Sequence, residues 1–238
     1  MLEAFGLSDP GCIRSNNEDY FISDSRSGVF IVADGMGGAN AGEYASRLSA
    51  ETLYEFLLNS SEDNSLGNLE QGFANANSAV RTASLEGPEF DGMGTTLVAV
   101  RVVDDFHMQI GNVGDSRAYC LSAGELSLLT KDHTWVTEVG SRLGLTDDAL
   151  RRHPMRHVLT MAIGVSDEIR VNSHVFSVFS GDQILLCCDG LHGVVEEEIL
   201  RDTLNSEKSL PEKAHYLVEA AKERGGPDNI TVVLIRIL

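Results

Sequence analysis

Basic residues are scarce in this sequence. Lys and Arg total 18 against 36 for Asp and Glu, and the formal net charge is −18 at pH 7. Such a chain is repelled by nucleic-acid phosphates and by anionic membrane surfaces. We therefore expect no nucleic acid and no membrane among its partners.

Long apolar runs and paired cysteines are also missing. No run approaches the roughly 20 residues needed to cross a bilayer, and the N-terminus lacks the basic start and apolar stretch of a secretory signal. We expect a cytoplasmic protein. Cys12, Cys120, Cys187 and Cys188 form no CxxC pair, so neither a disulfide framework nor a zinc site is indicated. The adjacent Cys187 and Cys188 lie within an apolar run, where thiols act as small core residues.

The remaining composition suits a packed globular fold. The chain has 238 residues, of which 42% are hydrophobic, enough for a sizeable core. It contains no internal repeat, low-complexity tract or Pro/Ser-rich linker, and strand-like segments occur at both ends and in the middle. We expect one domain covering residues 1–238.

Two continuously apolar segments, residues 29–33 and 183–188, each run into an Asp-Gly pair. The pattern predicts buried strands that deliver Asp34 and Asp189 to strand ends. Further strands are predicted at 95–103, 106–112, 117–121 and 230–238, and helices at 42–58, at 66–83 and from Pro211 onward. Strands with two buried faces fit a parallel doubly wound sheet and two stacked antiparallel sheets equally well, so periodicity leaves both open.

Acidic residues beside glycines or turn residues follow several of these apolar runs. They are Glu18-Asp19, Asp34-Gly35, Asp115, Asp189-Gly190 and Asp228. Any single Asp-Gly is most often a hairpin turn. Several carboxylates that converge would repel one another unless a cation neutralised them, and oxygen ligands favour Mg²⁺ or Mn²⁺ over zinc.

Seven ordered motifs resemble the metal-dependent protein phosphatases of the 2C type, the PPM family, over essentially the whole chain. They are RSNNED (14–19), VADGMGG (32–38) with GEYAS (42–46), GMGTTL (92–97), NVGDSRAY (112–119), LTKDHT (129–134), CDGL (188–191) and GPDNIT (226–231). The compact length and Met36 after Asp34-Gly35 resemble the bacterial branch of the family.

The resemblance implies an α+β fold, a four-layer α/β/β/α sandwich with two central antiparallel β-sheets flanked by helices. It also implies two core Mn²⁺ or Mg²⁺ ions. Asp34 would bridge both, Asp189 and Asp228 would complete one, and Glu18 with the Gly35 carbonyl would hold the other. Asp19 would act from behind these ligands, and Asp115 with Asp189 would hold a third, weaker ion.

The resemblance further implies a serine/threonine phosphatase, in which a water bridging the two ions attacks the phosphorus of phosphoserine or phosphothreonine. Arg14 matches the position that binds substrate phosphate, and its guanidinium can grip two phosphate oxygens. The bland alternative for Arg14 is a surface salt bridge with Glu18 or Asp19. Met36 stands where many eukaryotic members carry a histidine, so that candidate proton donor is missing.

Residues 132–163 match a flap beside the active site in this family. The segment is rich in Arg and His, which would attract phosphorylated protein substrates, although a solvated loop without substrate contact explains it nearly as well. We expect a monomeric signalling enzyme. The main alternative is an inactive member that binds phosphoproteins as a regulatory module, and a second is a phosphatase of other esters such as nucleotides.

Overall fold

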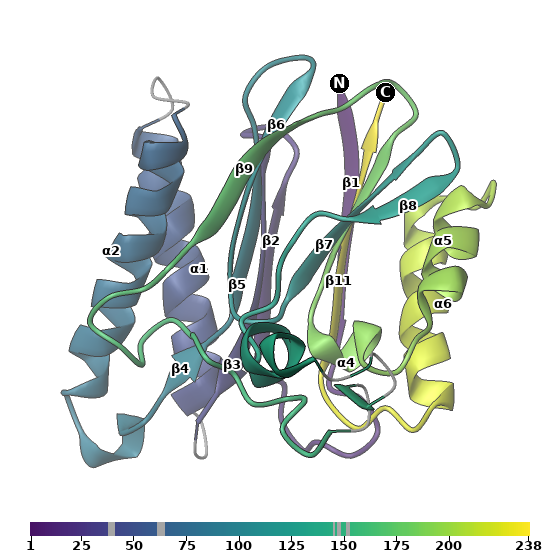
Figure 1. The fold of residues 1–238 in the computed structure, drawn as a ribbon. Coiled ribbons are helices and arrows are strands. Elements are labelled where there is room, and N and C mark those ends of the chain that lie inside the picture. Colours follow the sequence, from purple (N-terminus) through teal and green to yellow (C-terminus); the bar gives the residue numbers. More distant parts are fainter. Residues whose placement is uncertain (38–40, 61–64, 145, 147–148, 151–152) are drawn as a thin grey trace.

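The computed structural model describes residues 1–37, 41–60, 65–144, 146, 149–150 and 153–238 (Figure 1). Its strands are β1 (Leu2–Asp9), β2 (Asp19–Asp24), β3 (Val29–Met36), β4 (Gly94–Thr95), β5 (Leu97–Val102), β6 (His107–Val113), β7 (Arg117–Ser122), β8 (Glu125–Leu128), β9 (Asn172–Ser177), β10 (Gln183–Cys187) and β11 (Ile230–Ile237). Its α-helices are α1 (Ala41–Asn59), α2 (Leu66–Ser84), α4 (Asp189–His192), α5 (Glu197–Asn205) and α6 (Leu210–Glu223). Short irregular helical turns occur at η1 (Pro88–Phe90), η2 (Val136–Gly140) and η3 (Ser141–Leu143).

The strands form two stacked sheets. One has the order β1-β11-β10-β7-β8, and the other has the order β2-β3-β5-β6-β9 with β4 paired to β3. Each of these pairings is antiparallel. Of the two arrangements that periodicity left open, the structure has the antiparallel one, and it confirms the expected α+β sandwich.

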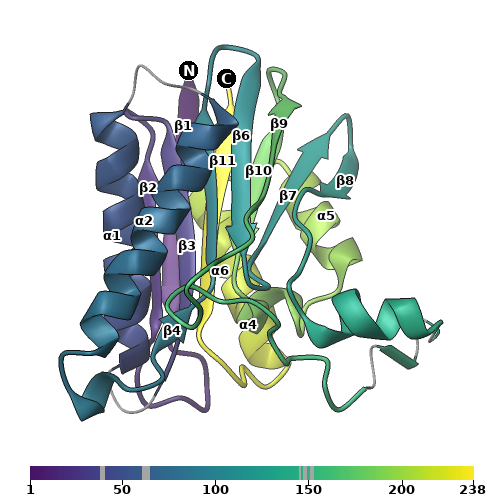
Figure 2. The same ribbon diagram turned by 60° about the vertical axis from the view of Figure 1, so that its left-hand side comes forward.

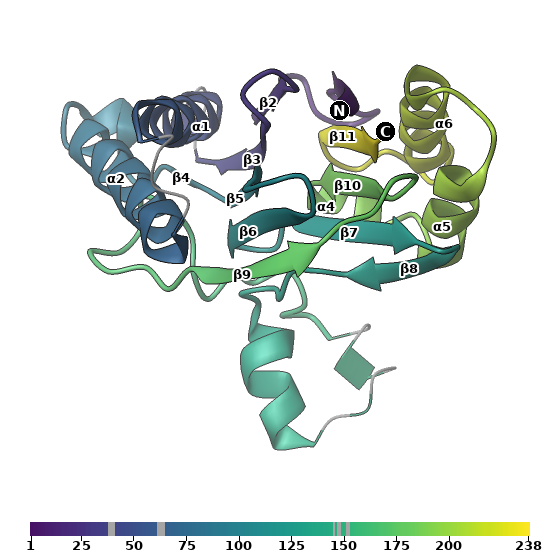
Figure 3. The same ribbon diagram turned by 90° about the horizontal axis from the view of Figure 1, so that it is seen from above.

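Helices cover both outer faces of the sheet pair, α1 and α2 on one side and α5 and α6 on the other (Figures 1 and 3). This layering explains why the strands read as continuous apolar runs. On β3, Ile31 and Ala33 pack toward α1 and α2, whereas Phe30 and Val32 pack between the sheets. Both faces of the strand are therefore buried.

The three predicted helices correspond to α1, α2 and α6. Each predicted boundary lies within one residue of the observed one. At α6, Ser209 and Glu212 form a capping box, in which the Ser209 backbone N–H donates to the Glu212 carboxylate at 2.9 Å. Ala214, Leu217, Val218 and Ala221 face inward as expected. None of the helices in the described ranges combines the length and apolar character of a bilayer-spanning segment.

The predicted strand at 95–103 is interrupted at Thr96. Thr95 exchanges two backbone hydrogen bonds with Ile163, whose N–H donates to Thr95 at 2.9 Å. Thr96 instead donates its backbone N–H to Asp34. The backbone hydrogen-bond partner thus changes from Ile163 at Thr95 to Asp34 at Thr96, and β5 starts at Leu97.

The segment between β8 and β9 leaves the sandwich below α5 (Figure 2). A bridge between Thr134 and Leu159 closes its base. Within it, the rings of Trp135 and His153 stack with their centroids 4.6 Å apart. This segment corresponds to the predicted flap, 132–163. Two of its arginines, Arg151 and Arg152, lie outside the described residues.

Antiparallel order brings the acidic residues to one end of both sheets. The carboxyl ends of β3, β6 and β10 and the amino ends of β2, β7 and β11 meet there. Asp19 pairs in register with Asp34, while Asp115 follows β6, Asp189 follows β10 and Asp228 precedes β11. Residues as far apart in sequence as Asp19 and Asp228 can therefore share one site.

Candidate metal centre

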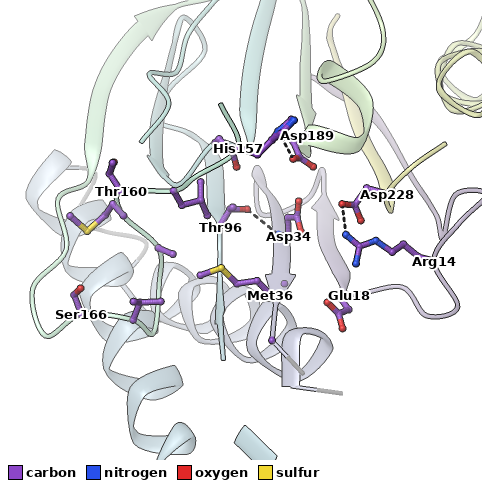
Figure 4. Close-up of a pocket in the computed structure, with 17 residues that line it drawn as sticks. Arg14, Glu18, Asp34, Met36, Thr96, His157, Thr160, Ser166, Asp189 and Asp228 are labelled. Atoms are coloured by element: carbon purple, nitrogen blue, oxygen red, sulfur yellow. Dashed lines mark hydrogen bonds and ion pairs between the residues drawn. The ribbon is translucent and has the colours of Figure 1, made fainter. Parts of the chain in front are cut away.

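One cavity of about 470 Å³ opens at this end of the sandwich. Seven predicted site residues line it: Arg14, Glu18, Asp34, Gly35, Asp115, Asp189 and Asp228. Figure 4 shows Asp34, Asp189 and Asp228 pointing toward a common space from separate strand ends. The eighth, Asp19, does not line the cavity and is buried behind it, with 8% exposure. The structure thus brings the predicted residues together; their binding of metal remains a prediction.

Asp34 exchanges two hydrogen bonds with Thr96. The Asp34 backbone N–H donates to Thr96 Oγ1 at 3.0 Å, and the Thr96 N–H donates to the Asp34 carbonyl at 2.9 Å. The Thr96 hydroxyl also lies 2.7 Å from that of Ser116, beside Asp115. Thr96 therefore links β3, which carries Asp34, to the turn that carries Asp115. The acidic residues alone did not predict this role for Thr96.

Gly35 and Gly42 allow the backbone to pass unusually close to Glu18. The Gly35 N–H donates to the Glu18 carbonyl at 3.1 Å. A Cβ at position 35 would lie 2.6 Å from that oxygen, and a Cβ at position 42 would lie 2.6 Å from Glu18 Oε2. Both distances are shorter than van der Waals contact, so glycine is required if the Glu18 carboxylate and the Gly35 carbonyl are to face one cavity.

Asn229 ties the loop before β2 to the strand that follows Asp228. Its side-chain amide donates to the carbonyls of Pro10 and Asn16 at 3.0 and 2.9 Å, and its oxygen accepts from the Glu18 N–H at 2.8 Å. The position of Glu18 relative to Asp228 thus depends on one amide side chain. The sequence contains a signal, because Asn229 belongs to the recognised GPDNIT motif.

Arg14 reaches into the cavity beside Asp228, and its Nη2 lies 2.8 Å from Asp228 Oδ2 (Figure 4). The ion-pair partner differs from Glu18 and Asp19, the two that the sequence suggested. About half of the Arg14 side chain, 51%, stays exposed, so the guanidinium is accessible to an anion from solvent.

Asp19 is only partly satisfied in its buried position. The Thr231 hydroxyl donates to Asp19 Oδ2 at 2.6 Å, while Asp19 Oδ1 has no partner within the described residues. Asp19, Asp34 and Cys188 bring potential ligand atoms within 4.8 Å of one another. Burial raises the pKa of the Cys188 thiol well above its ordinary value, so this cysteine stays protonated and is a poor ligand for a hard ion.

The cluster is electrostatically unfavourable without a cation. Burial, reinforced by repulsion from Asp19 and Asp189, raises the pKa of Asp34 well above its ordinary value. Burial raises the pKa of Asp19 to about 7 and, with repulsion from Asp189, that of Asp115 to about 8. The pKa of Asp189 is also raised, first by burial and then by Asp228.

These observations fit a centre for hard divalent cations. The donor set consists of carboxylates and one carbonyl, which suits Mn²⁺ or Mg²⁺. A bound cation would neutralise the repulsion that raises the pKa values and would supply the partner that Asp19 Oδ1 lacks, directly or through water.

The raised pKa values predict how metal stabilisation depends on pH. Above the ordinary value of 3.8 the unfolded chain has released these protons while the folded chain still holds them. Their contribution therefore favours the metal-free fold at low pH. It is lost as pH rises through the folded values of about 7 and 8.

We accordingly expect Mn²⁺ to stabilise the fold more at about pH 8.5 than at about pH 6. At a concentration one hundred times Kd, binding contributes about 2.7 kcal/mol, or roughly 5–10 °C in Tm for a domain of this size. Differential scanning fluorimetry with EDTA or Mn²⁺ at each pH measures this. An equal shift at both pH values would contradict the expectation.

Asp115 is fixed by its neighbours. Gly114 adopts φ +97°, a left-handed conformation that favours glycine. His192 Nε2 donates to the Asp115 carbonyl at 2.9 Å, and the Gly114 N–H donates to His133 Nδ1 at 3.2 Å. Burial lowers the pKa of His192 to about 4, so its ring is neutral. Both histidines therefore belong to the hydrogen-bond network that fixes the backbone around Asp115.

Two other residues complete the cavity wall. Met36 lines it with a thioether where an ionisable side chain would be a proton donor. His157, from the segment between β8 and β9, lines it from the other side, with Nδ1 3.9 Å from Asp189 Oδ2. The sequence gave no reason to prefer His157 over the other histidines, because only the fold places it beside Asp189.

Comparison with known proteins agrees with this geometry. The family model described as Protein phosphatase 2C matches residues 14–234. The chain is 35% identical over 237 residues to the serine/threonine phosphatase stp of Listeria welshimeri, covering 96% of this chain and 93% of that protein. It is also 35% identical over 238 residues to the serine/threonine protein phosphatase PstP of Mycobacterium tuberculosis, covering all of this chain and 45% of that protein.

Solved structures show the same fold. The M. tuberculosis phosphatase PstP/Ppp superposes with a TM-score of 0.92 at 34% identity, covering 99% of this chain and 98% of that one. The catalytic domain of PstP in complex with two manganese ions superposes with a TM-score of 0.86 at 33% identity, covering 99% and 97%. A closely similar fold thus holds two ions of the kind for which this donor set is suited.

Proposed function

The chain belongs to the protein phosphatase 2C family, and from this premise we propose that it is a metal-dependent protein serine/threonine phosphatase whose centre is built by Asp34, Asp189, Asp228, Glu18 and the Gly35 carbonyl. One observation carries the proposal: the acidic residues of separate motifs line a single cavity with Arg14 at its edge. The inactive alternative finds no support, because each proposed acidic position is filled by a carboxylate that faces this cavity or lies directly behind it.

Two Mn²⁺ or Mg²⁺ ions, when bound, would neutralise the carboxylates and the substrate phosphate and would make water nucleophilic enough to attack phosphorus. Asp34 would serve both ions, as the resemblance to the family implies, and it lines the same cavity as Asp189 and Asp228. Glu18 and Gly35 would hold one ion, and Asp189 and Asp228 the other. Asp115, with Asp189, would hold a third, weaker ion.

The other residues would bind the substrate phosphate or hold the metal centre in position. Arg14 would donate hydrogen bonds to two oxygens of the substrate phosphate, because its guanidinium is half-exposed and stays charged. Asp19, buried beneath Asp34, would orient the centre from behind through its free oxygen. Thr96 and Asn229 keep the acid-bearing loops in register by the hydrogen bonds described above.

The proposed substrates are proteins phosphorylated on serine or threonine. We propose that the enzyme forms one domain, with residues 132–163 as a flap, and acts as a cytoplasmic monomer. The net charge of −18 supports the absence of nucleic-acid and anionic-membrane partners.

Phosphate release from three substrates tests the function. With Mn²⁺, we expect a phosphothreonine peptide to have a higher kcat/KM than a nucleotide, and an artificial aryl phosphate to confirm that the centre is active. EDTA should abolish all turnover. Peptide binding without turnover would indicate the inactive alternative, and preference for the nucleotide would indicate a different phosphatase.

A further inference from the structure

A second cavity, of about 910 Å³, adjoins the metal centre. It shares three wall residues with the first cavity, Asp115, His157 and Asp189, so the two cavities meet at these residues. One side is formed by the segment between β8 and β9, and the other by the turn from α4 to α5. Space of this kind, beside a phosphate-binding pocket, can receive the polypeptide on one side of a phosphorylated residue.

The wall on the α5 side is acidic. Glu196, Glu197 and Glu198 are consecutive, exposed and line this cavity. Of the three, Glu198 has a cationic neighbour, Arg201, at 3.7 Å, whereas Glu196 and Glu197 form no ion pair within the described residues. We call Glu196–198 the acidic wall.

The cations that line the same cavity do not neutralise this wall. Arg117 is engaged by Asp132, with Nη2 2.7 Å from Oδ2 and Nε 3.0 Å from Oδ1. Arg156 is the other arginine in the described lining, so it adds one positive charge to a cavity that three glutamates also line.

A further carboxylate points to a cationic occupant. Asp115 is only 7% exposed, lines both cavities, and accepts no side-chain hydrogen bond from another described residue. Burying such a group is costly unless a positive or hydrogen-bonding partner approaches it. When the weak third ion proposed at Asp115 is absent, a positively charged occupant of the second cavity can supply that partner.

Building on the proposed phosphatase function, we propose that the second cavity is a substrate groove whose acidic wall selects phosphoproteins with a lysine or arginine close to the phosphorylated residue. A long basic side chain can lay its methylene groups along the cavity and present its charge to Glu196 and Glu197. The acidic wall also repels acidic sequences, so it sets preference among substrates while the metal centre performs the reaction.

The test is a panel of phosphothreonine peptides of alanine background, each with one lysine at a successive position on either side of the phosphothreonine. The measured quantity is kcat/KM for each lysine peptide divided by that for the alanine peptide. We expect one or two neighbouring positions to show about a tenfold preference, because exposed ion pairs contribute modestly and two carboxylates are available. The preference should shrink as salt is added.

The variant Glu196→Gln/Glu197→Gln should remove most of this preference. The matched control is Glu55→Gln/Glu86→Gln, which makes the same change of charge at exposed glutamates on α1 and just after α2, outside the lining of either cavity. The control should keep the preference and the activity. Tm values of both variants check that the loss of the first-turn glutamate of α5 has not disturbed the fold.

The outcomes separate the groove from the catalytic proposal. Equal kcat/KM for all peptides in the wild type would overturn the groove while leaving the phosphatase function intact. A fall for lysine and alanine peptides alike, together with weaker Mn²⁺ binding in Glu196→Gln/Glu197→Gln, would also overturn it and assign the acidic wall to a metal. Absence of turnover on every peptide with Mn²⁺ would contradict the phosphatase function itself.

Discussion

Replacing Asp34 by asparagine is expected to lower kcat/KM for a phosphothreonine peptide by at least about a thousandfold, because the proposed bridging ligand loses the charge that both ions require. The side chain keeps its shape, and the backbone hydrogen bonds with Thr96 are unaffected. Mn²⁺ binding should weaken in parallel, which isothermal titration calorimetry measures.

Stability separates this interpretation from simple misfolding. Asp34 is among several closely placed acids that repel one another, so Asp34→Asn should leave the Tm without added metal unchanged or higher. Asp105→Asn is the matched control, because Asp105 is exposed in the turn before β6, at the opposite end of the strands from the metal centre. If Asp34→Asn retained wild-type activity with saturating Mn²⁺, the assignment of Asp34 would be wrong.

Arg14→Ala should lower kcat/KM by about ten- to a hundredfold, since hydrogen bonds to a charged group contribute about 1.5–3 kcal/mol. Arg14→Lys should recover only part of this loss, because an ammonium cannot reproduce the two-pronged geometry of a guanidinium. Steady-state kinetics on a phosphothreonine peptide measure both variants.

Metal affinity and stability distinguish substrate binding by Arg14 from a purely structural role. Arg14 is paired with Asp228, a proposed metal ligand, so its removal should leave Mn²⁺ affinity unchanged or higher while activity falls. The half-exposed pair contributes at most about 1 kcal/mol to folding, so Tm should barely change. Arg47→Ala, which breaks the exposed pair with Glu51, is the control. Full activity of Arg14→Ala would leave the salt bridge as its only role.

The strands that the sequence predicted and those it missed differ in their place in the sheets. β3, β5, β6, β7, β10 and β11 are interior strands, and their two buried faces make them continuously apolar. β1, β8, β2 and β9 are the four sheet edges. Edge strands carry mixed polar sequence because one side faces solvent. On β9, for example, Val175 is 44% exposed, so hydrophobic pattern alone could not identify the strand.

The candidate site also contains residues that the sequence predicted and residues that it did not. Asp34 and Asp189 were predictable because each follows a buried strand, and Glu18, Asp115 and Asp228 because each lies beside glycine or turn residues. The recognised motifs added the role of each residue. Which residues would meet could not be read from periodicity, since convergence depends on antiparallel order. Thr96 and Asn229 were missed because they act through hydrogen bonds to residues tens to hundreds of positions away.

The location of bound Mn²⁺ tests the central claim most directly. Anomalous diffraction at the manganese edge, from crystals grown with Mn²⁺, should reveal two ions roughly 4 Å apart, both contacted by Asp34, with Asp189 and Asp228 on one and Glu18 on the other. Manganese bound elsewhere, with Asp34, Asp189 and Asp228 contacting no ion, would contradict the account.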